Sequence, residues 1–210
     1  MNKSQNNTTL YVIRHGATDL NLEHRYQGKT DILLSTIGRN QIEKLRQRLE
    51  TISFDIVLTS SAKRSQETCE FLFTTNTPVI VHPGLTEINF GVWEEHTYHE
   101  IQSLYPEQLS KCEQDPFKYS PHDGETYDVV LDRISKMYQQ ICVNYRGKTV
   151  GIVGHAGSLN ILLCHLFGIK PLTRWQFHLK PASLSRVVIY PDNQVVMELF
   201  NDTCHLKENG

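Results

Sequence analysis

Four side chains that carry a positive charge or an imidazole follow apolar runs of the sequence, namely Arg14, His15, Arg64 and His155. An arginine guanidinium is planar and matches two oxygens of a phosphate at once. A neutral imidazole is a competent nucleophile near neutral pH. Cationic groups that converge repel one another unless an anion lies between them. This set of side chains therefore predicts a site that binds a phosphoryl group and could transfer it.

These side chains can meet only if the strands before them lie in one parallel sheet. The runs Leu10 to Ile13, Phe54 to Thr59 and Thr149 to Gly154 are apolar and partly β-branched, which is typical of buried parallel strands. Ligands of open α/β sheets bind beyond the carboxyl ends of such strands. Gly16 allows a tight turn directly after His15. The sequence therefore predicts an α/β fold with its site at that end of the sheet.

Helices are expected between the strands, because apolar residues recur there at helical spacing. Ser35 can cap a helix that runs to about Glu50, and Arg64 lies in the first turn of the next helix, whose N-terminus can offer backbone donors to an anion. The long segment 17–34 is predicted to be a functional loop, and the tail from Asn201 to be loose. Further helices are predicted over 62–73, 125–145 and 158–167, and strands over 79–81, 177–179, 185–190 and 195–200.

The composition limits the classes of function. The 210 residues carry a net charge of −2, which gives no basic surface for nucleic acid. The most apolar stretch, 159–169, is too short to cross a membrane, and residues 1–9 contain no apolar signal core. The five cysteines include no CxxC pair, which indicates reduced thiols and a cytoplasmic protein. The sequence has no GxxxxGKS/T loop, which argues against a P-loop nucleotidase.

We expect a single domain over residues 1–210, since this length suits one folding unit with an inserted cap. At about 92–124 the sequence changes to short, polar, aromatic-containing pieces separated by prolines, which we interpret as a small helical cap. His96 and His99 in this segment have the spacing of a helical zinc pair. No third ligand is evident, so we interpret the spacing as a chance feature of a polar helix surface.

Four motifs, in their order along the chain, resemble the histidine phosphatase superfamily and in particular its phosphoglycerate mutase-like branch. They are Arg14-His15-Gly16, Ser60-x-x-x-Arg64-x-x-x-Thr68, the Glu-x-x-Phe-Gly-x-Trp-Glu run from Glu87 to Glu94, and His155 after its strand. The resemblance extends from Tyr11 to about Tyr190. It implies a three-layer α/β sandwich with a mostly parallel central sheet and a small helical cap inserted after the third strand.

The resemblance also implies a mechanism through a phosphohistidine. His15 takes the phosphoryl group, and Glu87 donates a proton to the leaving oxygen and then helps to activate water. No cofactor and no metal ion are implied. The residues implied to bind the phosphate or to line its pocket are Arg14, Asn21, Gln27, Gly28, Arg64 and His155.

Three positions depart from the pattern common in this family. Glu95 stands where a glycine is usual, Ala156 where a glycine follows the second histidine, and Asn160 near the position of an arginine. Ala156 still offers its backbone N–H, so we expect catalysis to survive, whereas Glu95 and Asn160 bear on the choice of substrate. The run 154–158 is similar to a nucleophile elbow, but its centre is alanine, which argues against a serine hydrolase.

The sequence leaves three functions open. The first is a metal-independent phosphomonoesterase for a small phosphorylated metabolite, and the runs Gly28 to Asp31 and Asn89 to Glu94 are similar to α-ribazole phosphatases of cobalamin synthesis and to broad-specificity sugar-phosphate phosphatases. The second is a phosphoglycerate mutase-like phosphotransferase. The third is a non-catalytic phosphate-binding module, against which the pairing of His15 with Glu87 argues. We expect no nucleic acid and no membrane as partners, and a homodimer stays an option.

Overall fold

Within the part of the chain that the structure describes, six strands form one sheet in the order β3-β2-β4-β1-β5-β6. The structure, a computed structural model, describes residues 6–73, 76–170 and 177–207. The pairs β1–β4, β2–β3 and β2–β4 are parallel, whereas β1–β5 and β5–β6 are antiparallel. The strands are β1 (Thr8–Arg14), β2 (Ile56–Thr59), β3 (Val79–Val81), β4 (Thr149–Gly154), β5 (Leu184–Ile189) and β6 (Val195–Asp202).

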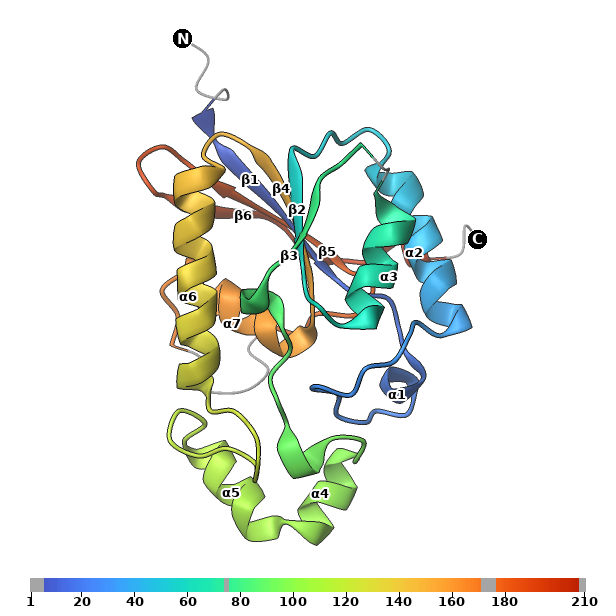
Figure 1. Ribbon diagram of the computed structural model, residues 1–210, viewed down its shortest axis with the longest axis vertical. Coiled ribbons are helices and arrows are strands. Elements are labelled where there is room, and N and C mark those ends of the chain that lie inside the picture. The colour runs from blue at the N-terminus through green and yellow to red at the C-terminus, as the bar shows by residue number, and fades with distance from the viewer. Residues whose placement is uncertain (1–5, 74–75, 171–176, 208–210) are drawn as a thin grey trace.

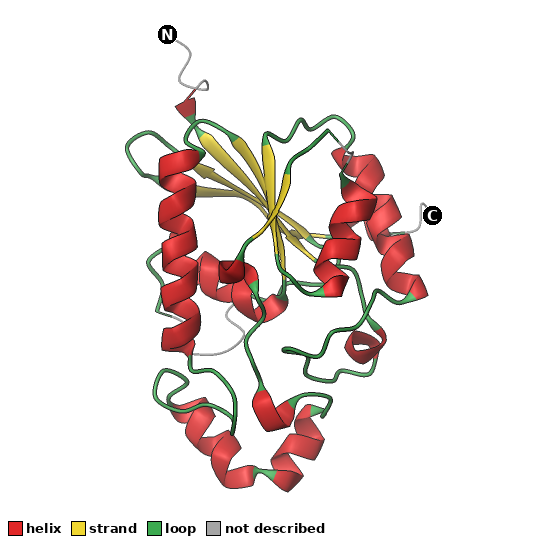
Figure 2. Cartoon of the chain, in the orientation of Figure 1, coloured by secondary structure: helices red, strands yellow, loops and turns green. Residues whose placement is uncertain are grey.

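Helices cover both faces of this sheet (Figures 1 and 2). The helices α6 (Tyr127–Asn144) and α7 (Ala156–Leu166) lie on one face, and α2 (Thr36–Leu49) and α3 (Lys63–Leu72) lie on the other. Side chains alternate between the two faces along a strand. Leu10 and Val12 accordingly join the core under α6 and α7, whereas Ile13 joins the core under α2 and α3. The predicted three-layer α/β fold with a mostly parallel sheet is confirmed.

Local signals in the sequence explain where several helices begin. The Ser35 hydroxyl accepts a hydrogen bond from the backbone N–H of Gly38 and so caps α2. Thr97 and Glu100 form a reciprocal capping box at the start of α4 (Tyr98–Leu104). The helix α5 (Pro106–Gln114) begins with a proline, which has no backbone N–H. Its absence costs nothing in the first turn, because an N–H there would have no intrahelical acceptor.

The segment expected to form a cap contains the 3₁₀ turn η3 (Gly91–Trp93), α4 and α5. Figure 1 shows α4 and α5 at the end of the molecule opposite the N-terminus, apart from the sheet. Trp93 is fully buried and its Nε1 donates a hydrogen bond to Gln108 Oε1 at 3.0 Å. An isolated bridge between Arg25 and Thr97 connects this segment to the loop after β1.

The predicted strand over 177–179 is wrong. Residues 177–180 follow an irregular path, because side chains from elsewhere in the fold take their backbone carbonyls. Arg14 donates to the carbonyl of Leu179, and Asn160 donates to the carbonyl of Phe177. A strand in this position would need those carbonyls for a neighbouring strand.

Two further expectations need correction. The predicted loop 17–34 contains the short helix α1 (Asp19–Leu22), which a capping box between Thr18 and Asn21 supports. The tail expected to be loose from Asn201 instead continues β6 to Asp202 and forms the 3₁₀ turn η4 (Cys204–Leu206). The Asp202 carboxylate pairs with Arg48 of α2 and thereby attaches the tail to that helix. Among the described residues, no helix is long and apolar enough to span a bilayer.

Candidate active site

His15 follows the last residue of β1, and only 3% of its surface is exposed. Its Nδ1 lies 2.7 Å from the carbonyl oxygen of Gly16. Because a carbonyl can only accept, Nδ1 carries the hydrogen and Nε2 keeps its lone pair. Burial, together with the charges of Arg64 and Arg14, lowers the pKa of His15 well below its ordinary value of 6.5. At pH 7 His15 is therefore a neutral imidazole whose Nε2 can act as a nucleophile.

Arg64 is the second residue of α3 and is fully buried. Its Nη1 donates to the carbonyl of Thr30 at 2.7 Å, and its Nη2 donates to the carbonyl of Gly28 at 3.0 Å. Its Nε donates to Nδ1 of His155 at 3.1 Å. Burial lowers the pKa of Arg64, and the charge of Glu87 opposes this shift. The loop over 28–30 thus fixes the plane of a guanidinium that lines the site.

His155 caps α7 directly behind His15. The two imidazole rings meet edge to face, with centroids 5.0 Å apart. Since arginine cannot accept, Nδ1 of His155 must be the acceptor of the bond from Arg64, and Nε2 carries the hydrogen 3.3 Å from Ser65 Oγ. Both ring nitrogens therefore face protein atoms, which differs from the expectation that His155 contacts the phosphate directly. Burial and the Arg64 charge lower the pKa of His155 well below 6.5.

Two buried donors that line the same cavity as His15 have no hydrogen-bond acceptor among the described residues. They are Nε of Arg14 and Nε2 of Gln27. The other contacts of these side chains hold them in place, since Arg14 Nη1 donates to the Leu179 carbonyl at 2.6 Å and Gln27 Oε1 accepts from the Thr18 hydroxyl at 2.9 Å. Burying an unpaired donor costs free energy unless a ligand supplies the acceptor. The two unpaired donors, Arg14 Nε and Gln27 Nε2, therefore fit an anion with several oxygens.

Asn21 comes to the site through the short helix α1. Its Oδ1 accepts from the backbone N–H of Thr18 at 3.1 Å, and its own backbone N–H donates to the Thr18 hydroxyl. With Oδ1 engaged, the amide NH₂ group is the part of the side chain that can donate to a ligand. Thr18 thus orients both Asn21 and Gln27.

Glu87 lies at the N-terminus of α7. One carboxylate oxygen accepts from the backbone N–H groups of Ser158 and Ile88 at 2.8 Å, and the other accepts from that of Gly157 at 2.9 Å. The helix N-terminus carries a partial positive charge that stabilises a carboxylate there. Gly157 is required for this approach, because a Cβ at that position would lie 2.6 Å from a Glu87 oxygen.

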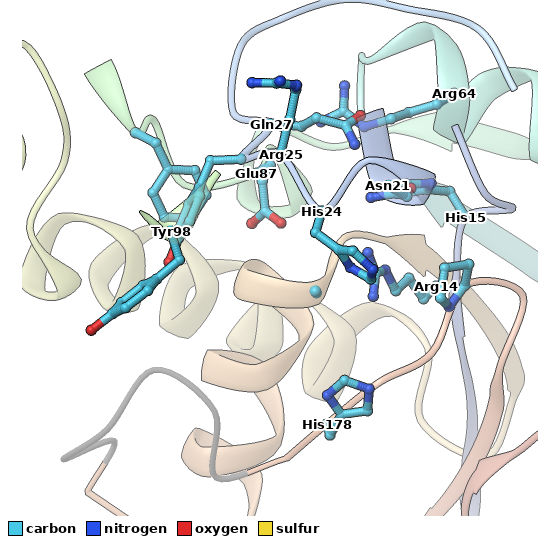
Figure 3. A pocket seen from close by; sticks show the side chains of 14 residues that line it. Arg14, His15, Asn21, His24, Arg25, Gln27, Arg64, Glu87, Tyr98 and His178 are labelled. Carbon is cyan, nitrogen blue, oxygen red and sulfur yellow. The ribbon is translucent and has the colours of Figure 1, made fainter. Parts of the chain in front are cut away.

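With the exception of His155, the side chains described above line one cavity of about 440 Å³ at the end of β1 (Figure 3). A cavity of this size suits a small phosphorylated molecule. Six of the predicted site residues line it, namely Arg14, His15, Asn21, Gln27, Arg64 and Glu87. The remaining lining residues are His24, Arg25, Tyr26, Phe90, Tyr98, Ala156, His178 and Pro181.

Gly28 and His155 are predicted site residues that do not line the cavity. Gly28 acts through its backbone carbonyl, which accepts from Arg64. A Cβ on Gly28 would lie 2.2 Å from an oxygen of Glu94 and 2.6 Å from the Ile88 carbonyl, so the close packing of this loop needs glycine. Both residues lie next to the cavity and support residues that line it.

At the start of α3, where we expected backbone donors for an anion, two N–H groups already have acceptors in the protein. The backbone N–H of Lys63 donates to Asp31 Oδ1 at 2.8 Å, and that of Ala62 donates to Ser60 Oγ at 3.2 Å. Protein oxygens therefore already occupy these first donors. The start of α7 also lines the cavity, through Ala156.

Sequence reasoning missed the outer part of the cavity, where His24, Arg25, Tyr98 and His178 lie (Figure 3). Of these four residues, Arg25 is the one for which the sequence carries a signal, because the nearby Glu23 indicates an ion pair. Its guanidinium pairs with Glu23 at 2.8 Å and Glu100 at 2.7 Å. The others come from the loop after α1, from α4 and from the irregular segment before β5, and no periodic pattern predicts that these would meet.

The positions that depart from the family pattern have structural roles. Glu95 has φ of 65°, the left-handed conformation that a glycine adopts without strain. Asn160 donates to the Phe177 carbonyl at 2.9 Å and so holds the segment that leads to His178.

His96 and His99 lie in ring contacts with Tyr105 and Tyr98. Across residues 6–73, 76–170 and 177–207, no group of three or more His, Cys, Asp or Glu is arranged to hold a metal ion.

Comparison with known proteins agrees with this geometry. The model of the histidine phosphatase superfamily (branch 1) matches residues 10–203. Phosphoserine phosphatase 1 of Hydrogenobacter thermophilus is 30% identical over 200 residues, which cover 95% of this chain and 94% of that protein. Adenosylcobalamin/α-ribazole phosphatase of Escherichia coli is 28% identical and covers 86% of this chain and 89% of its own.

A solved structure gives the same result. The crystal structure of the α-ribazole phosphatase from Shigella flexneri superposes with a TM-score of 0.84 at 27% identity, over 96% of this chain and 100% of that one. The match of the family model across nearly the whole chain, the named relatives and the shared fold lead to one conclusion. The chain belongs to the histidine phosphatase superfamily (branch 1) and is a phosphatase.

Proposed function

We propose that the protein is a metal-independent phosphomonoesterase that acts on a small phosphorylated metabolite through a phosphohistidine intermediate. The observation that carries this proposal is the pair of unpaired buried donors, Arg14 Nε and Gln27 Nε2, next to a neutral His15. The donors suit phosphate oxygens, and the guanidinium groups of Arg14 and Arg64 stabilise the charge that a metal ion would otherwise neutralise. His15 Nε2 supplies the nucleophile.

In the first step, the lone pair on His15 Nε2 forms a bond to phosphorus, and the bond from phosphorus to the leaving oxygen breaks. Glu87, as its carboxylic acid, gives its proton to that oxygen. In the second step, Glu87 takes a proton from water, whose oxygen attacks phosphorus and releases inorganic phosphate and His15. His155 supports both steps from behind, because its ring packs on His15 and accepts a hydrogen bond from Arg64.

For the substrate we propose α-ribazole 5′-phosphate, in line with the named relatives. The aromatic side chains of Tyr26, Phe90 and Tyr98 line the cavity and suit a leaving alcohol that carries an aromatic base. Arg25, the guanidinium in the outer part of the cavity, is already paired with Glu23 and Glu100. A substrate carboxylate would have to compete with those carboxylates, which argues against phosphoserine even though another relative is named for it.

A mutase activity is less well supported. Such an enzyme needs cations for the carboxylate of phosphoglycerate, and the two cap lysines do not line the cavity. Lys111 lies along a groove of the cap, and Lys118 lies over the ring of Tyr119.

We further propose that the chain acts as one domain in a cytoplasmic, reducing compartment, which the absence of disulfides among its five cysteines supports.

Transfer of label from a ³²P-phosphomonoester tests the mechanism. We expect brief incubation to label the wild-type protein through an acid-labile, base-stable bond, both with and without excess EDTA. His15→Ala should fold and fail to take up label. Acid-stable label, label that persists in His15→Ala, or loss of activity in EDTA that Zn²⁺ or Mg²⁺ restores would contradict the proposal.

A substrate panel tests the specificity. We expect kcat/KM to be highest for α-ribazole 5′-phosphate, above phosphoserine and sugar phosphates. A flat profile would indicate a broad-specificity phosphatase. Faster isomerisation of 3-phosphoglycerate, supplied with its bisphosphate primer, than release of phosphate from any ester would establish a mutase.

A further inference from the structure

The segment that carries Glu87 lies against helix α6. The 3₁₀ turn η2 (Pro83–Leu85) begins this contact. A Cβ on Gly84 would lie 2.8 Å from the Cβ of Met137 and 3.0 Å from the carbonyl oxygen of Arg133. Glycine at position 84 therefore lets the main chain approach α6 within reach of a side chain from that helix.

That side chain is Arg133, whose guanidinium binds three backbone carbonyls in the segment that leads to Glu87. Its Nη1 donates to the carbonyls of Gly84 at 2.9 Å and Thr86 at 2.6 Å, and its Nη2 donates to the carbonyl of Glu87 itself at 3.2 Å. The planar fork of arginine suits several fixed acceptors at once. Arg133 does not line the cavity, and its hydrogen bonds reach the site through the segment that carries Glu87.

Glu125 completes the arrangement on the far side of Glu87. Its Oε2 lies 3.5 Å from Arg133 Nη2 and accepts from the backbone N–H of Asn89 at 2.8 Å. The backbone N–H of Glu125 also donates to the Asn89 carbonyl at 2.9 Å. The side chain of Arg133 is 18% exposed, so these contacts are largely shielded from water.

We infer that Arg133 is a positioning residue that sets the place of the Glu87 carboxyl group for proton transfer, an inference that rests on the proposed function. The helix start of α7 holds the carboxylate, and Arg133 of α6 holds the main chain that carries it. Proton transfer requires a short, aligned contact, and a displacement of about 1 Å can reduce a rate about 100-fold. The two helices together fix Glu87 relative to His15.

The test compares kcat/KM for phenyl phosphate, whose leaving oxygen is basic, with that for 2,4-dinitrophenyl phosphate, which needs no acid. This quantity reports the steps up to departure of the leaving group. For Arg133→Met we expect a loss of about 100-fold on phenyl phosphate and less than about threefold on the dinitrophenyl ester. The kcat/KM of Arg133→Lys for phenyl phosphate should lie between those of wild type and Arg133→Met, because one ammonium cannot reach three carbonyls.

Two further variants make the result decisive. Lys136→Met, on the same helix and exposed in a pair with Asp132, should match wild type on both esters. In a Glu87→Gln background, Arg133→Met should add no further loss that depends on the leaving group. Equal losses on both esters in both Arg133 variants, or additive losses in the double variant, would overturn the inference. If Glu87→Gln alone loses the same factor of kcat/KM on both esters, Glu87 is not the general acid, and that part of the proposed function is wrong.

Discussion

One backbone carbonyl determines which nitrogen of His15 can react. The Gly16 oxygen takes the hydrogen on Nδ1, so the reactive lone pair lies on Nε2. Burial lowers the pKa of this ring, and the charges of Arg64 and Arg14 add to that effect. The arginines that we propose to hold phosphate oxygens therefore also help to keep the proposed nucleophile neutral.

Glu87→Gln tests the role of a single carboxyl group. An amide has nearly the same shape and cannot donate its proton to an alkoxide, so we expect kcat/KM for phenyl phosphate to fall by about 10²–10⁴-fold. The loss on 2,4-dinitrophenyl phosphate should be much smaller, because that leaving group departs without protonation. Steady-state kinetics on the two esters gives the comparison. Equal losses would show that Glu87 is structural, since no other carboxylate lines the cavity among the described residues.

The sequence predicts that Arg14, His15 and Arg64 lie together, and in the structure all three line one cavity, for a physical reason. Each follows a buried strand, and parallel strands bring such positions to one end of a sheet. His24 and His178 come from loops whose paths depend on tertiary contacts, such as the bond from Asn160 to Phe177. The local sequence around them carries no comparable signal, so the outer cavity was beyond prediction.

At the level of elements, the loop over 28–30 connects the cap to Arg64, the arginine that we propose to bind phosphate. Glu94 of the cap accepts hydrogen bonds from the backbone N–H groups of Lys29 and Thr30, each at 2.8 Å. The carbonyls of Gly28 and Thr30 in turn accept from Arg64. One carboxylate thus holds the loop that orients the guanidinium.

Glu94→Gln should therefore weaken phosphate binding without touching the ligand. An amide NH₂ in place of one oxygen would face backbone N–H donors and lose at least one hydrogen bond, a cost of about 1–3 kcal/mol. We expect the inhibition constant of inorganic phosphate to rise by about tenfold. The neighbouring Glu95→Gln is the matched control, because its side chain is exposed, and it should leave that constant unchanged. An unchanged constant in Glu94→Gln would disprove the connection.

The elements themselves show what a pattern can and cannot predict. The strands before Arg14 and His155 and the helix capped by Ser35 have strong local signals, and the structure has them within a few residues of the predicted bounds. The run 177–179 has β-forming residues, but side chains of Arg14 and Asn160 take two of the carbonyls that a strand would need. The place of a strand in a sheet is a property of the whole fold.

At the scale of the whole molecule, the sheet buries two imidazoles between its helical layers. In the unfolded chain a histidine titrates near pH 6.5. Burial lowers the pKa of both His15 and His155 in the folded protein, and the charge of Arg64 adds to it. Below pH 6.5 the unfolded chain therefore binds more protons than the folded one, and the free energy of unfolding must fall as the pH falls.

Thermal or urea unfolding between pH 7.5 and 5 measures this effect. We expect full stability above about pH 6.5 and a decline below it, with each of the two histidines contributing up to about 1.4 kcal/mol per pH unit. His15→Asn should make the decline shallower, because it removes one of the buried groups that must stay neutral. The exposed His99→Asn serves as the control and should follow wild type. The range stops at pH 5 because most carboxylates titrate below it. Parallel curves for wild type and His15→Asn over this range would show that the site around His15 accommodates the imidazolium, contrary to its burial beside two guanidinium groups.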